Sequence, residues 1–304
     1  MLRLARGFAL VFGRHVTRVC ILPVSLYYFI RRGPERRASR VYLERVLGQP
    51  VSFLSVLRHI HCFSCTILDR LFLLSERFKR FDIRTFGLAD LDRILEGGKG
   101  VLLIGSHLGS FDALRVLSLE RPDVRVRILL DTVQGEQISS VLNELNPALA
   151  ASIINARGVG PTVAITIKEA LDRNSIVALL ADRGQPGNPT QSADFLGYLA
   201  PLPTSPWLLA AALKVPVMLA FGLYRGDNRY DLHFELFADT IAIERSRRSE
   251  ALAEILQRFA DRLAHYARLG PYNWFNFYDF WDDPPARRAA DRPADDAGDL
   301  LRRS

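Results

Sequence analysis

GVLLIGSHLGSFDALR, residues 100–115, begins with a short apolar run and changes character at His107. The run over 100–106 is continuous and apolar, which is typical of a strand buried on both faces of a sheet. Glycines at 105 and 109 permit a turn around the histidine, and the pattern becomes helical from residue 111. The stretch therefore predicts a strand, a turn and a helix, the repeating unit of an α/β fold.

The same alternation continues along the chain. Further buried strands are expected at 124–130, 151–156 and 175–181, and a pair of strands at 215–224 and 230–237. Apolar residues at three- and four-residue spacing predict helices at 35–47, 52–75, 88–96, 111–119, 136–145, 161–173, 205–214 and 247–268. We therefore expect an α/β fold with a mixed, mostly parallel sheet flanked by helices, and an N-terminal membrane-associated helical arm.

Composition divides the chain into three parts. With 304 residues, about half of them hydrophobic, the chain can bury a large core. We expect a membrane-associated basic and apolar helix over 1–34 and an α/β domain over 35–281. The last part, 282–304, is charged and rich in alanine and proline, which is typical of a disordered tail.

Positive charge is concentrated at the N-terminus. The net charge is +7, and residues 1–50 contain ten arginines and two glutamates, so the rest of the chain is close to neutral. No basic stripe with interleaved aromatic residues continues into the body, which argues against nucleic acid as a partner. Because the arginines flank apolar sequence, an anionic membrane surface fits better.

The apolar part of the arm is short for a membrane span. Val19 to Ile30 carries no charge, but it has only 12 residues, whereas a span needs about 20. Extension upstream takes in side chains that are costly at the bilayer centre, Arg14, His15 and Arg18. No small-residue cleavage site of a signal peptide follows. We expect an interfacial helix with Tyr27 and Tyr28 at headgroup level; a helix buried in the body and a true span are the alternatives.

Three cysteines occur, at 20, 62 and 65, and none lies near a histidine cluster with zinc spacing. We expect buried thiols in a reducing compartment and no metal site. A redox role for Cys62 and Cys65 lacks the strand-to-helix context of such motifs.

His107 and Asp112 are separated by five positions. Within one helix their side chains would point about 140° apart and could not touch. If His107 lies in the turn before the helix, the Asp112 carboxylate can reach back to the imidazole, fix its tautomer and leave the other nitrogen as a base. The alternative is a helix-capping turn with a hydrogen-bonded core histidine.

Four blocks in order resemble the lysophospholipid-type acyltransferase superfamily, and more specifically the bacterial late acyltransferases of lipid A biosynthesis. They are GVLLIGSHLGSFDALR, VALLADRGQPGN, FLGYLAPLPTSPWLLAAALKVPVM and PYNWFNFYDFW, within a resemblance from about residue 8 to 281. The first carries the HX4D pattern of the superfamily. The arm sequence RRASRVYLERVLG and the ending NWFNFYDFW suggest a divergent branch that acylates other lipids or belongs to pigment biosynthesis.

The resemblance implies a membrane-associated enzyme on the cytoplasmic face of the bacterial inner membrane. It would move a fatty acyl chain from a thioester, acyl carrier protein or acyl-coenzyme A, to a hydroxyl of a lipid or glycolipid, without a bound cofactor or metal. His107 would be the general base and Asp112 its orienting partner.

Positive and polar residues near the same sheet edge are candidates for substrate binding. Arg183 follows a buried strand, as His107 does, and could hold the oxyanion or a phosphate; pairing with Asp182 or another carboxylate is the alternative. Arg157 precedes two glycines and a helix N-terminus, a pattern shared by anion nests and ordinary loops. Thr204 is expected to cap the helix that begins after it, and the family would place it beside the acyl pocket. A carrier protein would need basic residues near the site, such as those of 31–45.

Two other functions compete with acyl transfer. A thioesterase or lipid hydrolase could use the same base on water, although no G-x-S-x-G nucleophile motif is present. A catalytically silent lipid-binding protein would keep the fold and the arm, but the intact HX4D pattern argues against it.

Overall fold

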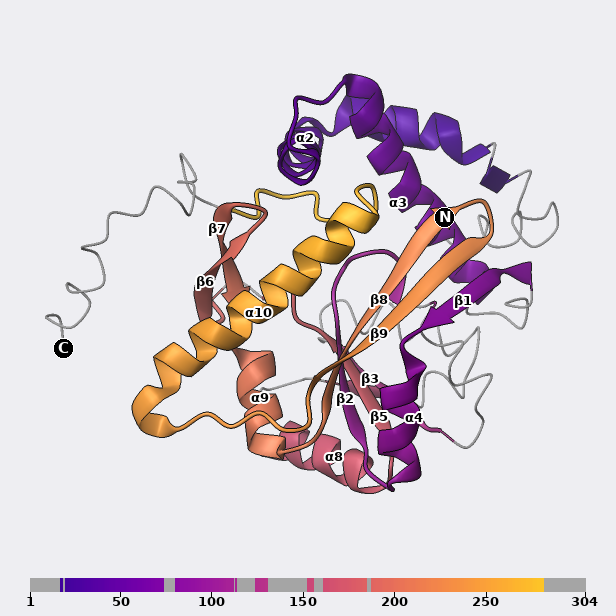
Figure 1. The fold of residues 1–304 in the computed structure, drawn as a ribbon. Helices are drawn as coiled ribbons and strands as arrows, with labels where there is room; N and C mark the ends of the chain where they lie inside the picture. Colours follow the sequence, from indigo (N-terminus) through magenta and orange to yellow (C-terminus); the bar gives the residue numbers. More distant parts are fainter. Residues whose placement is uncertain are drawn as a thin grey trace, which may run out of the picture.

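The structure is a computed structural model, and it describes residues 17–18, 20–73, 80–111, 113, 124–130, 152–155, 161–184 and 187–281. Within them, seven strands form one sheet in the order β1-β9-β8-β2-β5-β3-β4 (Figure 1). The strands are β1 (Asp82–Phe86), β2 (Val101–Gly105), β3 (Val126–Leu130), β4 (Ile153–Asn155), β5 (Ile176–Leu180), β8 (Val217–Gly226) and β9 (Arg229–Ala238). From β8 to β4 all neighbours are parallel, β9 is antiparallel to β8, and β1 is parallel to β9. The predicted mixed, mostly parallel α/β sheet is confirmed.

Alternate residues of the central strands enter two separate cores. Leu102 and Ile104 of β2 join one core, and Val101 and Leu103 join the other. This alternation explains the continuous apolar runs, because both faces of a covered sheet need apolar side chains. The first core is covered by α2 (Gly33–Leu47), α8 (Pro161–Asp172), α9 (Ser205–Leu213) and α10 (Arg248–Leu269), and the second by α4 (Leu88–Glu96). Helix α3 (Phe53–Leu73) contributes to both.

A small hairpin lies beside α10 (Figure 1) and was not expected from the sequence. Its strands are β6 (Thr190–Phe195) and β7 (Tyr198–Pro203), joined by a two-residue turn. Leu196 and Gly197 in the turn both have positive φ, as a type I′ hairpin turn requires. Gln257 of α10 bonds both the N–H and the carbonyl of Asp194, which holds the hairpin against the helix.

The expected helices at 35–47, 52–75, 88–96, 161–173, 205–214 and 247–268 are present within two residues of their predicted bounds. Strand β1 was not expected, since its residues are mostly exposed and carry no apolar run. The helix expected at 136–145, most of the one at 111–119 and the tail 282–304 lie outside the described residues.

Candidate active site

His107 and Asp182 face each other across two neighbouring strands. Strands β2 and β5 are parallel, and their last pair is Gly105 with Leu180. Each of the two side chains lies two positions beyond this pair, so the register itself brings them together. Parallel strands place their carboxyl ends at one edge of the sheet, which is where ligands bind in open α/β folds. The prediction that His107 lies in a turn at this edge is confirmed.

Asp182 accepts three hydrogen bonds, two of them from His107. Its Oδ1 lies 2.8 Å from His107 Nδ1, and its Oδ2 accepts from the His107 backbone N–H at 3.0 Å and from Trp274 Nε1–H at 3.0 Å. The carboxylate is fully buried, whereas the imidazole is about a quarter exposed. A buried carboxylate needs such partners, because it has lost its hydration.

The charge state of Asp182 follows from these contacts. Burial alone would raise the pKa of its carboxyl, but the hydrogen bonds from His107, the positive charge that this imidazole gains on protonation and the charge of Arg183 outweigh burial, so the pKa is lowered. Because an ionised carboxylate only accepts, Nδ1 of His107 carries the proton. The second ring nitrogen, Nε2, is then the one that can take up a proton from a substrate.

Backbone hydrogen bonds at Gly109 and Ser110 fix the turn after His107. The Gly109 N–H donates to the Asn273 carbonyl and the Ser110 N–H to the Gly222 carbonyl, both at 2.7 Å. Gly109 has φ of +73°, and a Cβ there would lie 1.8 Å from the Gly222 oxygen. Only glycine fits at this position. The Phe275 N–H also donates to the His107 carbonyl at 2.9 Å, so strand β8 and the C-terminal segment both fix the turn.

The predicted site residues have different outcomes. Asp112 and Arg157 lie outside the described residues, so the predicted pair of His107 with Asp112 stays a prediction, while Asp182 is the carboxylate seen on Nδ1. Arg183 lies at the predicted edge, and in the described part of the chain its guanidinium forms no ion pair with a carboxylate. Thr204 is at the N-cap position of α9, but its hydroxyl donates to the Pro189 carbonyl at 3.2 Å instead of capping the helix.

Asp182 and Trp274 are the site residues that the sequence analysis missed. We expected Trp274 to be a core or membrane-facing aromatic residue; it is fully buried, and its indole N–H also binds the carboxylate. The sequence feature that could have identified Asp182 is its position directly after a buried strand, which is also the position of His107. The order of strands in the sheet was needed to recognise it, because residues 106–175 separate the two strands in sequence.

Backbone donors for an oxyanion are limited here. The N–H groups of His107, Gly109 and Ser110 all donate to protein acceptors. Among the groups predicted for the site, the guanidinium of Arg183 is therefore the donor that the described residues leave available.

The N-terminal helix is largely exposed. Residues 20–31 are helical and carry a set of exposed apolar side chains, Leu22, Val24, Leu26, Tyr27 and Ile30. This exposure contradicts the alternative of a helix buried in the body. Among the described residues, no helix combines the length and apolar character that crossing a membrane requires.

The expectation of a buried thiol was wrong for Cys20, and Arg45 packs against two aromatic rings. Cys20 is exposed, because it belongs to this N-terminal helix, whereas Cys62 and Cys65 are buried free thiols as predicted. Arg45, one of the basic residues considered for carrier docking, has its guanidinium 3.8 Å from the ring centre of Tyr198 and 4.0 Å from that of Trp281. Its guanidinium therefore stacks on two aromatic rings, and its part in carrier docking stays a prediction.

No His, Cys, Asp and Glu cluster suited to a metal ion occurs in the parts of the chain that are described. Comparison of the chain with models of known protein families and with curated proteins gave no match.

Proposed function

We propose that the protein is a membrane-associated acyltransferase that moves a fatty acyl chain from a thioester to a hydroxyl of a lipid or glycolipid. The observation that carries this proposal is the His107–Asp182 pair at the carboxyl edge of the sheet, with Nδ1 held by a buried carboxylate and Nε2 left as a base. The HX4D pattern and the three other sequence blocks supply the reaction class.

The reaction needs no nucleophile from the protein. His107 Nε2 would take the proton of the acceptor hydroxyl while the oxygen attacks the thioester carbonyl, and Asp182 would stabilise the imidazolium that forms. Arg183 would hold the negative oxygen of the tetrahedral intermediate. When the intermediate collapses, the C–S bond breaks and the imidazolium returns the proton to the leaving thiolate.

The N-terminal helix supports a site at a membrane surface. An exposed apolar row on a helix flanked by arginines is the pattern of an interfacial helix, since large apolar patches seldom face water in a monomer. A lipid acceptor would then reach His107 from the bilayer, and acyl carrier protein or acyl-coenzyme A would bring the donor from the aqueous side.

The test measures release of thiol from an acyl carrier protein together with formation of acyl ester, with and without a hydroxyl-bearing lipid. Thiol release should require the acceptor and match the ester formed. His107→Ala should lower the rate by about 10²–10⁴ without changing the circular dichroism spectrum. Thiol release without acceptor would favour a hydrolase, and a rate within a few-fold of wild type in His107→Ala would reject the mechanism.

A further inference from the structure

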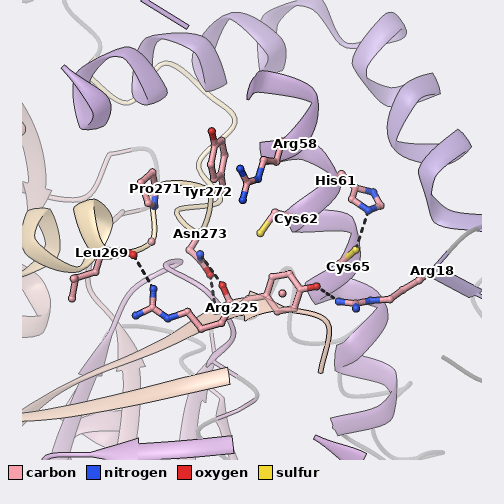
Figure 2. A pocket seen from close by; sticks show the side chains of 13 residues that line it. Arg18, Arg58, His61, Cys62, Cys65, Arg225, Leu269, Pro271, Tyr272 and Asn273 are labelled. Carbon is pink, nitrogen blue, oxygen red and sulfur yellow. Dashed lines mark hydrogen bonds between the residues drawn. The ribbon is translucent and has the colours of Figure 1, made fainter. Parts of the chain in front are cut away.

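A pocket of about 400 Å³ lies between α3, the end of α10 and the β8–β9 hairpin (Figure 2). This volume suits a small headgroup. Three arginines line it, Arg18, Arg58 and Arg225, and no aspartate or glutamate is among the described residues of its wall. The wall therefore presents guanidinium groups and no carboxylate of its own, which favours anionic ligands.

Two of these arginines are paired with carboxylates that do not line the pocket. Arg225 donates through Nε to Asp231 at 2.7 Å and through Nη1 to the Leu269 carbonyl at 2.8 Å. Arg18 pairs with Asp227 at 3.2 Å and with the buried Asp69 at 3.8 Å. Its buried Nε has no hydrogen-bond partner in the described part of the chain. Both guanidiniums are thus held in place without a carboxylate entering the pocket.

Arg58 differs from the other two arginines because the described residues offer it no carboxylate partner. It is an exposed residue of α3, and its guanidinium lies 4.4 Å from the ring centre of Tyr272. No carboxylate pairs with it among the residues that the structure describes. Stacking on the ring fixes the plane of the guanidinium and leaves its N–H edges for a ligand.

We propose that this pocket binds the phosphate group of a phosphorylated ligand, with Arg58 as the principal contact and Arg225 beside it. Arginine suits phosphate because its planar guanidinium can donate two parallel hydrogen bonds to two phosphate oxygens. Nothing in the wall would repel a dianion, and three guanidiniums surround the cavity.

The position of the pocket relates it to the membrane and to His107. His61 of the wall lies 3.2 Å from Ser25 of the exposed N-terminal helix, so the pocket adjoins the apolar row. On its other side, Asn273 of the wall accepts the Gly109 N–H and directly precedes Trp274, which binds Asp182. A phosphate bound here would sit between a membrane surface and the catalytic edge of the sheet. Binding itself requires neither acyl transfer nor His107.

The test is calorimetric titration of the full chain with glycerol 3-phosphate, and flotation with phosphatidylcholine vesicles that contain phosphatidic acid. Vesicles with the same fraction of cholesteryl hemisuccinate, an anionic lipid without phosphate, control for surface charge. Arg58→Gln is compared with Arg245→Gln, which removes an exposed arginine outside the pocket, and with His107→Ala.

Arg58→Gln should weaken phosphate binding at least tenfold, while Arg245→Gln and His107→Ala stay within twofold of wild type. If Arg58→Gln loses binding of glycerol 3-phosphate, a soluble phosphate ester is identified as a ligand. If Arg58→Gln loses binding only of vesicles that contain phosphatidic acid, a lipid headgroup is identified as the ligand. The proposal is overturned if wild type binds neither probe, or if Arg58→Gln and Arg245→Gln behave alike in both arms. An inactive His107→Ala that still binds phosphate separates this result from that of the acyltransferase proposal.

Discussion

At the scale of residues, Asp182 determines what His107 can do. Its two oxygens accept three N–H groups, from the His107 ring, the His107 backbone and Trp274, so the imidazole has one orientation and one tautomer. Hydrogen bonds to a charged group are worth about 1.5–3 kcal/mol each, so this carboxylate stabilises the fold in addition to its proposed role as partner of the base.

Asp182→Asn should therefore lower the acyl-transfer rate by at least about 10² and the free energy of unfolding by about 1–3 kcal/mol. The amide would turn an NH2 group toward N–H donors and could no longer stabilise an imidazolium. Transfer assays and urea unfolding measure the two effects, with the exposed Asp239→Asn as the control. Activity within a few-fold of wild type in Asp182→Asn, combined with a large loss in Asp112→Asn, would assign the orienting role to Asp112.

Sequence alone could place His107 and Arg183 at the sheet edge, because each follows a continuous apolar strand. It could not pair His107 with Asp182, since this requires knowing that β5 lies next to β2 although β3 and β4 come between them in the chain. The carboxylate five positions downstream is the nearest in sequence, and that proximity directed the prediction to Asp112.

At the scale of elements, His59 links two helices to the segment that carries Trp274. It is fully buried on α3, with Nδ1 2.8 Å from the Ser39 hydroxyl of α2 and Nε2 3.0 Å from the Trp274 carbonyl. Burial lowers the pKa of His59 to about 4, and the hydrogen bond to the carbonyl offsets this only in part. The neutral imidazole is thus the form that joins these elements.

This link should make stability depend on pH. The unfolded histidine titrates near 6.5, so the contribution of His59 is complete above that pH and is lost as the pH falls toward 4, by about 3 kcal/mol in total. Urea unfolding of wild type and His59→Gln between pH 7.5 and 4 measures it. The wild-type free energy of unfolding should fall more steeply, and parallel curves would show that His59 keeps an ordinary pKa when folded.

The elements that sequence analysis missed have weak patterns for physical reasons. Strand β1 is an edge strand with little buried surface, so its side chains need not alternate. Strand β7 contains Pro201 and Pro203, which argue against a strand in a large sheet but are tolerated in an isolated two-stranded hairpin.

At the scale of the whole molecule, the exposed N-terminal helix and the positive pocket lie on neighbouring elements, and the His107 turn is joined to them through Asn273. We therefore propose that the N-terminal helix is the part of the protein that contacts an anionic bilayer.

Replacement of Leu22 and Ile30 by serine should weaken binding to phosphatidylglycerol vesicles by about 2 kcal/mol, or about 30-fold, because each buried aliphatic side chain contributes at most about 1.5–3 kcal/mol. Ile165→Ser is the matched control, since Ile165 is an equally exposed apolar residue on α8. Co-sedimentation with vesicles measures the affinity of the variant and of the control. High salt should release wild type from the vesicles only in part. Equal losses in the variant and the control would argue against this helix as the membrane contact.

The most direct test of the central claim is a double-mutant cycle on the single-turnover rate of acyl transfer, with His107→Ala, Asp182→Asn and the double variant. If Asp182 acts through the imidazole, the double variant should be no slower than His107→Ala alone. Rates that fall by the product of the two single effects would contradict the account, because Asp182 would then contribute to transfer independently of His107.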